Sequence, residues 1–403
     1  MQRIVFINLH ANEFLVKTLS KYIWKQSCAF KHKYFLEYLL SDPEVEVCNY
    51  VNEDGFTLAK SLPKPIMWFL RKLRFAENRF VMLKNGIARR QIKVIRKNEI
   101  RPTDIVIGYR HVPCSLTDMV GISAFKAISM IHFHGEQSDS DLIAKANPDV
   151  LFNESDLTLY SEIFKRYYSW YHGKSIVHSF VAAPRFKRIT PFAQRQNRCF
   201  STGTITYKQH SEFIEVYGDP CDQPTRKQIL ENAKELEQYI ACYNSDYLED
   251  TDMKKYLPED SRMQHYRKVW YNMRHTGKQK KYFSFDMVEK FNDFKMCIIG
   301  EEVLGVPGIG FVEGMACGCA YIGQNLGYYE DYGMQEGVHY IGYDGTLEDL
   351  KAKITYYQQP ENQDELERIA NAGYEFAQKY FRGDFVAKEL LNKLVSARDK
   401  QHN

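Results

Sequence analysis

Short runs of apolar residues recur along the first half of the chain, separated by stretches with helical spacing. The runs predict strands at Arg3–Leu9, Val45–Val51, Asp104–Tyr109, Ala127–Phe133, Asp149–Phe152 and Ser175–Phe180. Between them, the spacing predicts helices at His32–Leu40 and Asp156–Tyr168. Strands that alternate with helices in this way form a parallel sheet covered on both faces. We therefore expect an α/β domain in residues 1–190.

A second strand–helix series fills the rest of the chain, after a proline-containing linker at Arg188–Asn197. The predicted elements are strands Cys199–Thr206, Lys295–Ile299 and Cys319–Gly323 and helices Phe285–Phe294, Leu347–Gln358 and Glu361–Tyr380. The segment Gly218–Lys281 is charged and mostly helical in pattern. We expect a second domain in residues 198–383 and a last amphipathic helix in residues 384–403.

Length and composition agree with two globular domains. A chain of 403 residues is too long for one ordinary core. A hydrophobic content of 44% and a charged content of 26% exclude wholesale disorder, and the net charge of +3 identifies no partner. No signal peptide begins the sequence, and no apolar run approaches the ~20 residues that span a bilayer. These features predict a cytoplasmic protein, soluble or peripheral on the inner face of the cytoplasmic membrane.

The cysteines and acidic pairs predict no metal site. The nine cysteines are scattered and odd in number, which argues against a disulfide framework and for a reducing compartment. Cys317 and Cys319 have no neighbouring His or Cys to complete a zinc site, so we interpret them as core residues. We interpret Asp139 and Asp141 as helix-capping residues.

One stretch, residues 61–100, stands out by its charge. It contains eleven Lys and Arg against Glu77 and Glu99, interleaved with aromatic and aliphatic residues. A basic amphipathic helix of this kind can lie on an anionic membrane surface. The alternative is a solvated helical face with a buried stripe, and the sequence leaves both open. Nucleic acid is not an expected partner, because no recognition module accompanies the patch.

The segment Gly305–Gly323 carries the clearest chemical signal. Its glycines follow an apolar strand and precede a short helix from Phe311 to about Cys317, which Gly318 ends in a left-handed conformation. A glycine-rich turn that opens a helix presents free N–H groups to a phosphate. Glu313 lies in the first helical turn, where a carboxylate can accept hydrogen bonds from ribose. The alternative is that the glycines only permit tight packing.

This segment, FVEGMACGCAYIG from Phe311 to Gly323, resembles the E-(A/G)-(M/L)-A-x-G-x-x-x-I element of group-1 glycosyltransferases. The resemblance extends over about Phe285–Phe381. It implies the GT-B fold, in which two Rossmann-like domains face each other across a cleft and a C-terminal helix crosses back to the N-terminal domain. It also implies a nucleotide-diphosphate sugar as donor. The diphosphate would bind the backbone of Gly308, Ile309, Gly310 and Phe311, and the ribose would bind Glu313.

The sequence departs from this family at two places. Retaining members carry a second glutamate eight positions before the first, and Gly305 stands there; Glu302 is the upstream acid that we assign to the donor. The usual basic pair is replaced by Lys208 and, further on, Arg226. A weaker similarity of Phe294-Lys295-Met296 to inverting fucosyltransferases implies that Lys295 faces the donor.

The N-terminal half of the site is expected after the strand Ala127–Phe133. His134-Gly135 resembles the histidine element of group-1 enzymes, and we predict His134 and Glu136 as catalytic residues. Alternation along an extended strand would put His132 and His134 on one face, so His132 can equally be a core histidine and Glu136 a surface acid. His111, beside Arg110, and His10 follow other strands and occupy similar positions.

Together these features imply a glycosyltransferase of bacterial capsule or lipopolysaccharide synthesis, acting on a glycan or lipid-linked glycan acceptor. It would need no metal and no cofactor besides its donor. The sequence leaves two alternatives. A sugar-nucleotide epimerase shares the fold but needs further acid–base carboxylates. A non-catalytic membrane-docked scaffold would account for Gly305.

Overall fold

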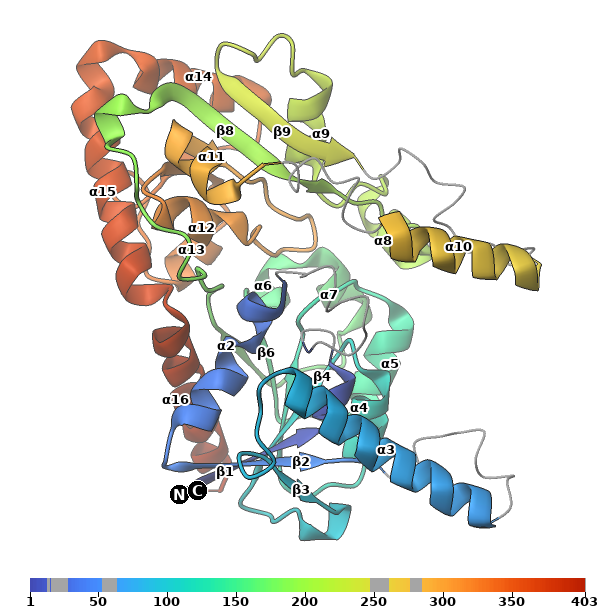
Figure 1. Ribbon diagram of the computed structural model, residues 1–403. Helices are drawn as coiled ribbons and strands as arrows, with labels where there is room; N and C mark the ends of the chain where they lie inside the picture. The colour runs from blue at the N-terminus through green and yellow to red at the C-terminus, as the bar shows by residue number, and fades with distance from the viewer. Residues whose placement is uncertain (13–14, 16–27, 53–63, 247–260, 276–284, 403) are drawn as a thin grey trace. The chain divides into compact units, whose positions relative to one another are not determined.

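The computed structural model describes residues 1–12, 15, 28–52, 64–246, 261–275 and 285–402 (Figure 1). The chain divides into two compact units. The first is Met1–Ser179 with Gly383–Asn403, and the second is Phe180–Arg382. Each unit contains one sheet whose strands all pair in parallel, with seven strands in the first and five in the second. The predicted α/β class is therefore confirmed. Within the described residues, no helix has the length and apolar character needed to cross a membrane.

The sheet of the N-terminal unit has the strand order β3-β2-β1-β4-β5-β6-β7. Its strands are β1 (Gln2–Ile7), β2 (Val45–Tyr50), β3 (Lys93–Ile95), β4 (Ile105–Tyr109), β5 (Phe125–Ser129), β6 (Val150–Asn153) and β7 (Lys174–Val177). The direction of winding reverses between β1 and β4. In an open parallel sheet, ligands bind beyond the carboxyl ends of the strands at such a reversal.

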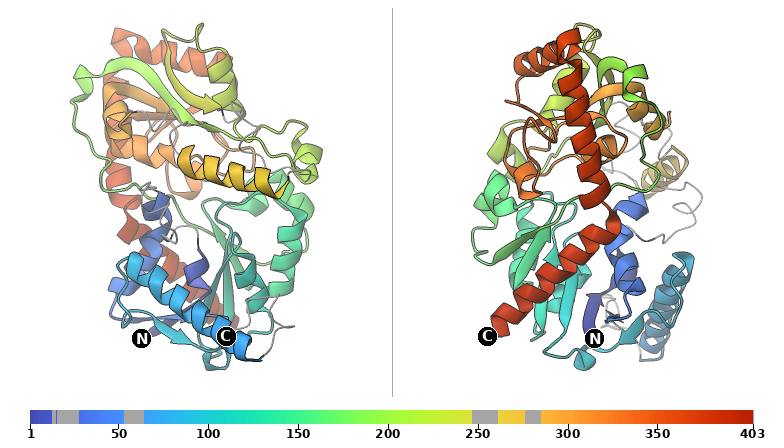
Figure 2. Two further views of the ribbon diagram at one scale, coloured as in Figure 1. Left: turned by 45° about the vertical axis from the view of Figure 1, so that its right-hand side comes forward. Right: turned by 90° about the vertical axis from the view of Figure 1, so that its left-hand side faces the viewer.

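Helices cover both faces of this sheet. They are α2 (Cys28–Ser41), α3 (Lys64–Lys84), α4 (Pro113–Met119), α5 (Gln137–Ala146), α6 (Leu157–Tyr160), α7 (Glu162–Tyr167) and α16 (Gly383–His402), with 3-10 turns η1 (Leu9–Ala11) and η3 (Lys97–Glu99). The helices α2 and α16 pack on each other (Figure 2), and α4 and α5 form a second packed pair. The Nζ of Lys393 on α16 donates to the Val177 carbonyl at 2.8 Å, and Arg398 donates to the Gln2 side chain at 2.8 Å. The terminal helix thus packs on the N-terminal unit, as the GT-B resemblance implies.

The sheet of the C-terminal unit has the order β12-β11-β10-β8-β9. Its strands are β8 (Gln196–Ile205), β9 (Ile240–Asp246), β10 (Phe294–Ile298), β11 (Ala320–Gln324) and β12 (Ile341–Tyr343). Its helices are α8 (Ser211–Tyr217), α9 (Pro224–Glu231), α10 (Arg262–His275), α11 (Met287–Asp293), α12 (Gly310–Ala316), α13 (Tyr328–Asp331), α14 (Leu347–Gln358) and α15 (Gln363–Tyr380), with 3-10 turns η4 (Phe192–Gln194) and η6 (Pro360–Asn362). Here the winding reverses between β8 and β10.

The core of the C-terminal unit lies between this sheet and α9, α14 and α15. Apolar side chains of β8, β10 and β11, including Met296, Ile298 and Ile322, pack there on Ile354 and Ile369. Cys317 and Cys319 are fully buried at the end of α12, which confirms their interpretation as core residues.

The following predictions differ from the structure. The strand Ala127–Phe133 ends at Ser129, and the helix Asp156–Tyr168 is broken in two by Ser161, which caps the second half by accepting from the Phe164 N–H. The helical interpretation of Gly218–Lys281 missed β9, whose half-exposed and polar residues hide the strand pattern.

Candidate functional site

The reversal point of the C-terminal sheet is organised around Arg226 of α9. Its Nε donates to the Ile299 carbonyl at 2.5 Å, its Nη1 to Thr204 at 2.8 Å and its Nη2 to Gly300 at 3.1 Å. Thr204 lies at the carboxyl end of β8, and Ile299 and Gly300 follow directly after β10, so the guanidinium spans the place where the two strands diverge. Arg226 is buried, and burial lowers its pKa, although the carboxylates of Glu302, Asp222 and Glu301 oppose this effect. The sequence prediction placed Arg226 at the donor site, and the structure places it at the reversal point.

Three glycines make room for this guanidinium. A Cβ added to Gly203 would lie 2.7 Å from the Arg226 Nε, and one added to Gly308 would lie 2.7 Å from its Nη2. A Cβ on Gly300 would lie 3.1 Å from the Arg226 Cγ. Contacts shorter than 3.0 Å do not occur for real side chains, so at Gly203 and Gly308 the backbone approaches the arginine in a way that only glycine allows. Part of the glycine signal in the sequence is therefore explained by packing around Arg226.

Gly305 has a different structural cause. The N–H of Glu302 donates to the Val306 carbonyl at 3.0 Å, and the N–H of Gly305 donates to the Glu302 carbonyl at 3.0 Å. These two bonds close a tight turn in which Gly305 has a φ of 82°. A residue with a Cβ is strained in this left-handed conformation. The turn therefore accounts for the glycine at the position where retaining group-1 enzymes carry a glutamate.

The predicted helix after the glycines is α12. It ends as expected, because Gly318 has a φ of 80° and its N–H donates to the Met315 carbonyl at 2.9 Å. The N–H of Cys319 donates to the Gly314 carbonyl at 3.0 Å, which completes the glycine-terminated C-cap. Glu313 lies in the first turn and is half-buried. The segment Gly308–Phe311 thus leads from the end of β10 into the first turn of α12.

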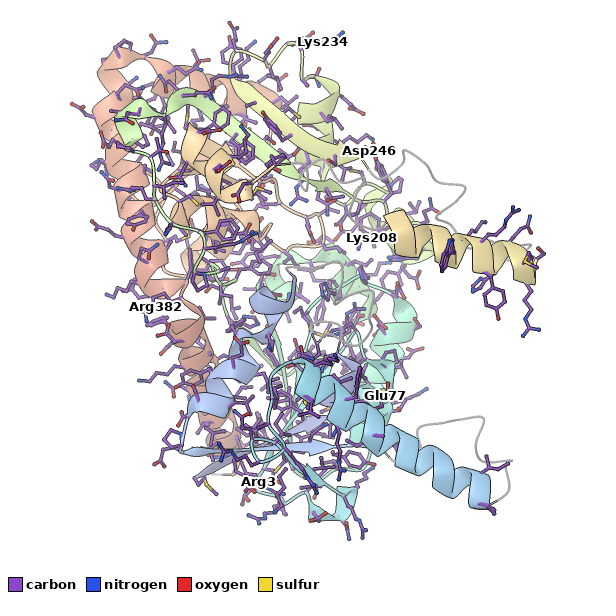
Figure 3. All side chains as sticks on the ribbon, viewed as in Figure 1. Arg3, Glu77, Lys208, Lys234, Asp246 and Arg382 are labelled. Atoms are coloured by element: carbon purple, nitrogen blue, oxygen red, sulfur yellow. The ribbon has the colours of Figure 1, made fainter. Side chains whose placement is uncertain are left out.

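Lys208 and Asp222 lie beside Arg226 at the same edge of the sheet. Figure 3 labels Lys208 beyond the end of β8 and Asp246 at the end of β9. The Lys208 Nζ is 3.5 Å from the Asp222 carboxylate, whose second oxygen is buried. Burial and the charge of Glu302 raise the pKa of Asp222 to about 7, whereas Lys208 lowers it. The structure therefore groups three of the residues assigned to the donor, Lys208, Arg226 and Glu302, and adds Asp222, which the sequence interpretation missed.

Glu301, next to Glu302 in the chain, is a second carboxylate at the end of β10. It is 4% exposed, and its Oε1 accepts hydrogen bonds from the Tyr329 hydroxyl at 2.7 Å, the Gln324 N–H at 2.9 Å and the Tyr321 hydroxyl at 3.2 Å. These bonds tie the carboxyl end of β10 to the end of β11 and to α13. Glu301 thus fixes the start of the loop that leads to Gly308.

Lys295 lies at the other end of β10. Its Nζ donates to the Gln363 side chain at 2.6 Å and lies 5.3 Å from the centre of the Phe192 ring. Lys295 is the second residue of the strand, so the structure does not bring it together with Glu302 or Gly308 at the carboxyl end. The similarity to the fucosyltransferase donor site is therefore unsupported.

In the N-terminal unit, Arg110 holds the loop between β5 and α5. Arg110 follows β4 and is 4% exposed. Its guanidinium donates to the carbonyls of Ile131 and His132 and pairs with the Asp139 carboxylate. Asp139 is therefore an ion-pair partner in the first turn of α5, and the expectation that it caps the helix was wrong: the N-cap position belongs to Glu136. Arg110 thus ties together the ends of two neighbouring strands.

The predicted alternation of His132 and His134 was also wrong. Both residues follow the end of β5, and His132 has a φ of 56°, so they do not share one face of an extended strand. His132 is exposed, and its ring packs edge-on against His111 with a centroid distance of 5.5 Å. Two histidines from the ends of β4 and β5 are thereby brought together, whereas His10 is buried in η1 after β1.

His134, Gly135 and Glu136 form the second half of this loop. Gly135 has a φ of 77°, and a Cβ there would lie 2.5 Å from Ile163 of α7, so both conformation and packing require glycine. His134 and Glu136 are half-exposed. The Glu136 carbonyl accepts from the Tyr168 hydroxyl at 3.2 Å, while its carboxylate makes no capping bond to the helix. Among the residues that the structure describes, no three His, Cys, Asp or Glu side chains are grouped for a metal ion.

Comparison with known proteins identifies the architecture. No family model matches the sequence, and no curated protein matches it. Among solved structures, Anabaena Alr3699/HepE in complex with UDP-glucose covers 98% of this chain and 100% of its own, with a TM-score of 0.50 and 11% identity. The chain has the GT-B fold. A glycosyltransferase from Rickettsia africae, with a TM-score of 0.49 and 11% identity, covers 98% of both chains. At this level of identity the likeness establishes the GT-B fold alone.

Proposed function

We propose that the protein is a glycosyltransferase that moves a sugar from a nucleotide-diphosphate sugar to a hydroxyl of a glycan or lipid-linked glycan. The observation that carries this proposal is the reversal point of the C-terminal sheet, where Arg226 packs against Gly308 of the segment that leads into α12 and Lys208 pairs with the neighbouring Asp222. HepE, which has the same fold, binds UDP-glucose. The element around Glu313 resembles the donor-binding element of group-1 enzymes.

The donor would bind through its diphosphate and its ribose. The backbone of Gly308–Phe311 would donate hydrogen bonds to the diphosphate, and Lys208 and Arg226 would supply positive charge. Arg226 uses three of its five N–H groups on backbone carbonyls, so it would act as a fixed charge beside the phosphates. Glu313 would accept hydrogen bonds from the ribose hydroxyls.

The acceptor would react at the loop after β5. In an inverting reaction Glu136 takes the proton of the acceptor hydroxyl while the hydroxyl oxygen attacks the anomeric carbon and the nucleoside diphosphate leaves. In a retaining reaction His134 contacts the sugar, and the leaving phosphate takes the acceptor proton. The half-exposed positions of His134 and Glu136 are compatible with either role.

The basic stretch would place the enzyme at the inner face of the cytoplasmic membrane, close to a lipid-linked acceptor of surface polysaccharide synthesis. It contains α3, on which Phe80 is 51% exposed and Leu83 is 67% exposed. The Lys84 ammonium lies 5.5 Å from the Phe80 ring, and Arg79 is exposed beside it. Exposed apolar side chains flanked by cations suit an anionic bilayer surface.

The experiment that tests donor binding compares Glu313→Ala with Glu348→Ala. Glu348 also lies in the first turn of a helix of the C-terminal unit, but it is exposed on α14. A panel of nucleoside diphosphates and nucleotide sugars is screened by thermal shift, since a ligand at about 100 times its Kd stabilises by about 2.7 kcal/mol. We expect a shift that E313A weakens and E348A leaves unchanged.

Product analysis then separates the alternatives. Transfer of the sugar to an added acceptor supports the proposal. Interconversion of the nucleotide sugar without an acceptor would indicate an epimerase. The absence of any nucleotide-dependent shift would contradict the proposal and favour a scaffold protein.

A further inference from the structure

The helix α10 has a composition unlike that of the other described helices of the C-terminal unit. Its fourteen residues, RMQHYRKVWYNMRH, contain four Lys and Arg and no Asp or Glu. The helix begins with a capping box: the Ser261 N–H donates to the Gln264 side chain at 2.7 Å, and the Gln264 N–H donates to the Ser261 hydroxyl at 3.3 Å. The sequence therefore specifies where this basic helix starts.

One side of α10 is apolar and exposed to solvent. Met263, Tyr266 and Trp270 are spaced three and four residues apart, which places them in one stripe along the helix. They are 71%, 59% and 57% exposed, respectively. Large apolar side chains are usually buried, so three exposed in one stripe indicate a surface that another phase or molecule covers.

The polar residues of α10 identify the chemistry of that partner. Arg262 and Arg267 are exposed and flank the stripe, whereas Lys268 on the opposite side is 7% exposed. A helix of this length spans about 21 Å and carries too much charge to cross a bilayer. Its cations complement anionic lipid headgroups, and tryptophan and tyrosine favour the boundary between headgroups and acyl chains.

We propose that α10 is an interfacial helix that lies on an anionic lipid bilayer, with Met263, Tyr266 and Trp270 inserted at the headgroup level. This would give the C-terminal unit a membrane contact of its own, in addition to the one proposed for α3. The role of α10 in sugar transfer rests on the proposed use of a lipid-linked acceptor. Vesicle binding is measured without donor or acceptor, so either proposal can fail alone.

The test is co-sedimentation of the full-length protein with vesicles of phosphatidylcholine and phosphatidylglycerol, compared with phosphatidylcholine alone. The double variant Tyr266→Ala and Trp270→Ala should lower the partition coefficient by at least about tenfold, the effect of losing one large buried side chain. Arg267→Glu should lower it by about thirtyfold, since each cation near the surface contributes about a factor of five. Arg267→Lys and Lys234→Glu, the latter an exposed charge reversal away from α10, should bind like wild type.

Tryptophan fluorescence provides a readout specific to this helix. Lipids brominated on their acyl chains should quench the emission of the wild type more than that of Trp270→Phe. Unchanged vesicle binding in Y266A/W270A, or equal quenching in W270F, would overturn the proposal even if Phe80→Asp/Leu83→Asp abolished binding through α3. Equal binding to vesicles of phosphatidylcholine without phosphatidylglycerol would overturn the proposal that α10 recognises anionic lipid. A concentration-dependent oligomer lost in Y266A/W270A, without vesicle binding, would assign the stripe to self-association instead.

Discussion

Replacing Gly308 by alanine tests whether the glycine segment and Arg226 form one unit. The new methyl group would lie 2.7 Å from the Arg226 Nη2, 2.7 Å from the Ile299 Cγ2 and 3.0 Å from the Gly300 carbonyl oxygen. The arginine cannot withdraw cheaply, because its guanidinium is held by carbonyls at the ends of both β8 and β10. The strain must therefore be shared between the strand ends and the loop.

The expected cost of Gly308→Ala is that of overpacking a filled site, about 1–3 kcal/mol. For a unit of this size, that corresponds to a fall in apparent melting temperature of roughly 2–12 °C. Gly310→Ala is the matched control, because the three atoms nearest to its methyl group all belong to the Ile299 side chain. We expect Gly310→Ala to cost less, since the outer atoms of Ile299 can move.

The assay combines thermal unfolding with titration of the nucleotide that gives the largest thermal shift. If the segment binds diphosphate, Gly308→Ala should weaken nucleotide binding more than Gly310→Ala does. A variant that is destabilised but binds nucleotide like wild type would show that the glycines serve packing alone. A variant that melts like wild type would refute the packing of Gly308 on Arg226.

Three further predictions concern other parts of the molecule. Burial lowers the pKa of His178 to about 4, so the stability linked to its neutral form is complete above pH 6.5 and is lost as the pH falls toward 4. Between pH 7 and pH 5, wild type should therefore lose on the order of 2 kcal/mol more unfolding free energy than His178→Phe loses. Equal losses in the two proteins, measured by thermal unfolding, would contradict the lowered pKa of His178. Arg110→Ala should reduce the transfer rate at least about tenfold while leaving the Kd for nucleotide unchanged, because it frees the loop that carries His134. A parallel loss of nucleotide affinity would show that Arg110 acts through overall folding. Gly305→Glu should lower the free energy of unfolding in urea by about 1–2 kcal/mol without raising activity. Gly305→Asn should lower it less, because asparagine tolerates a positive φ. Equal stability of Gly305→Glu and wild type would argue against the turn geometry.

Apolar patterning predicted most of the N-terminal sheet but not the end of β5. Met130, Ile131 and Phe133 are buried although they lie beyond the strand. Periodicity reports burial and not hydrogen bonding, so it extended the strand through a loop that packs inward. The edge strand β9 was missed for the opposite reason, because four of its seven residues are half-exposed while its backbone pairs with β8.

The candidate site, like the sheets, could be predicted only in part from the sequence. The glycine segment, its helix and the terminating Gly318 could be located from residue type, because positive φ and close backbone approach have few other solutions. The partners of Arg226 could not, since they are backbone carbonyls of strands far apart in sequence. Lys295 was expected to face the donor, but it lies near the amino end of β10. A motif gives the position of a residue along the chain, but it does not say at which end of the strand the residue lies.

The position of Gly305 bears directly on whether catalysis has been lost. From the sequence alone, a glycine in place of the family's second glutamate is the best support for the scaffold alternative. In the structure the glycine closes the turn between Glu302 and Val306 with a φ of 82°, and a glutamate is strained in this conformation. The charged groups at the reversal point remain costly to bury there, with Arg226, Asp222 and Glu301 each less than 9% exposed. The carboxylates around Arg226 oppose the effect of burial on its pKa, so the arginine keeps its positive charge at the reversal point.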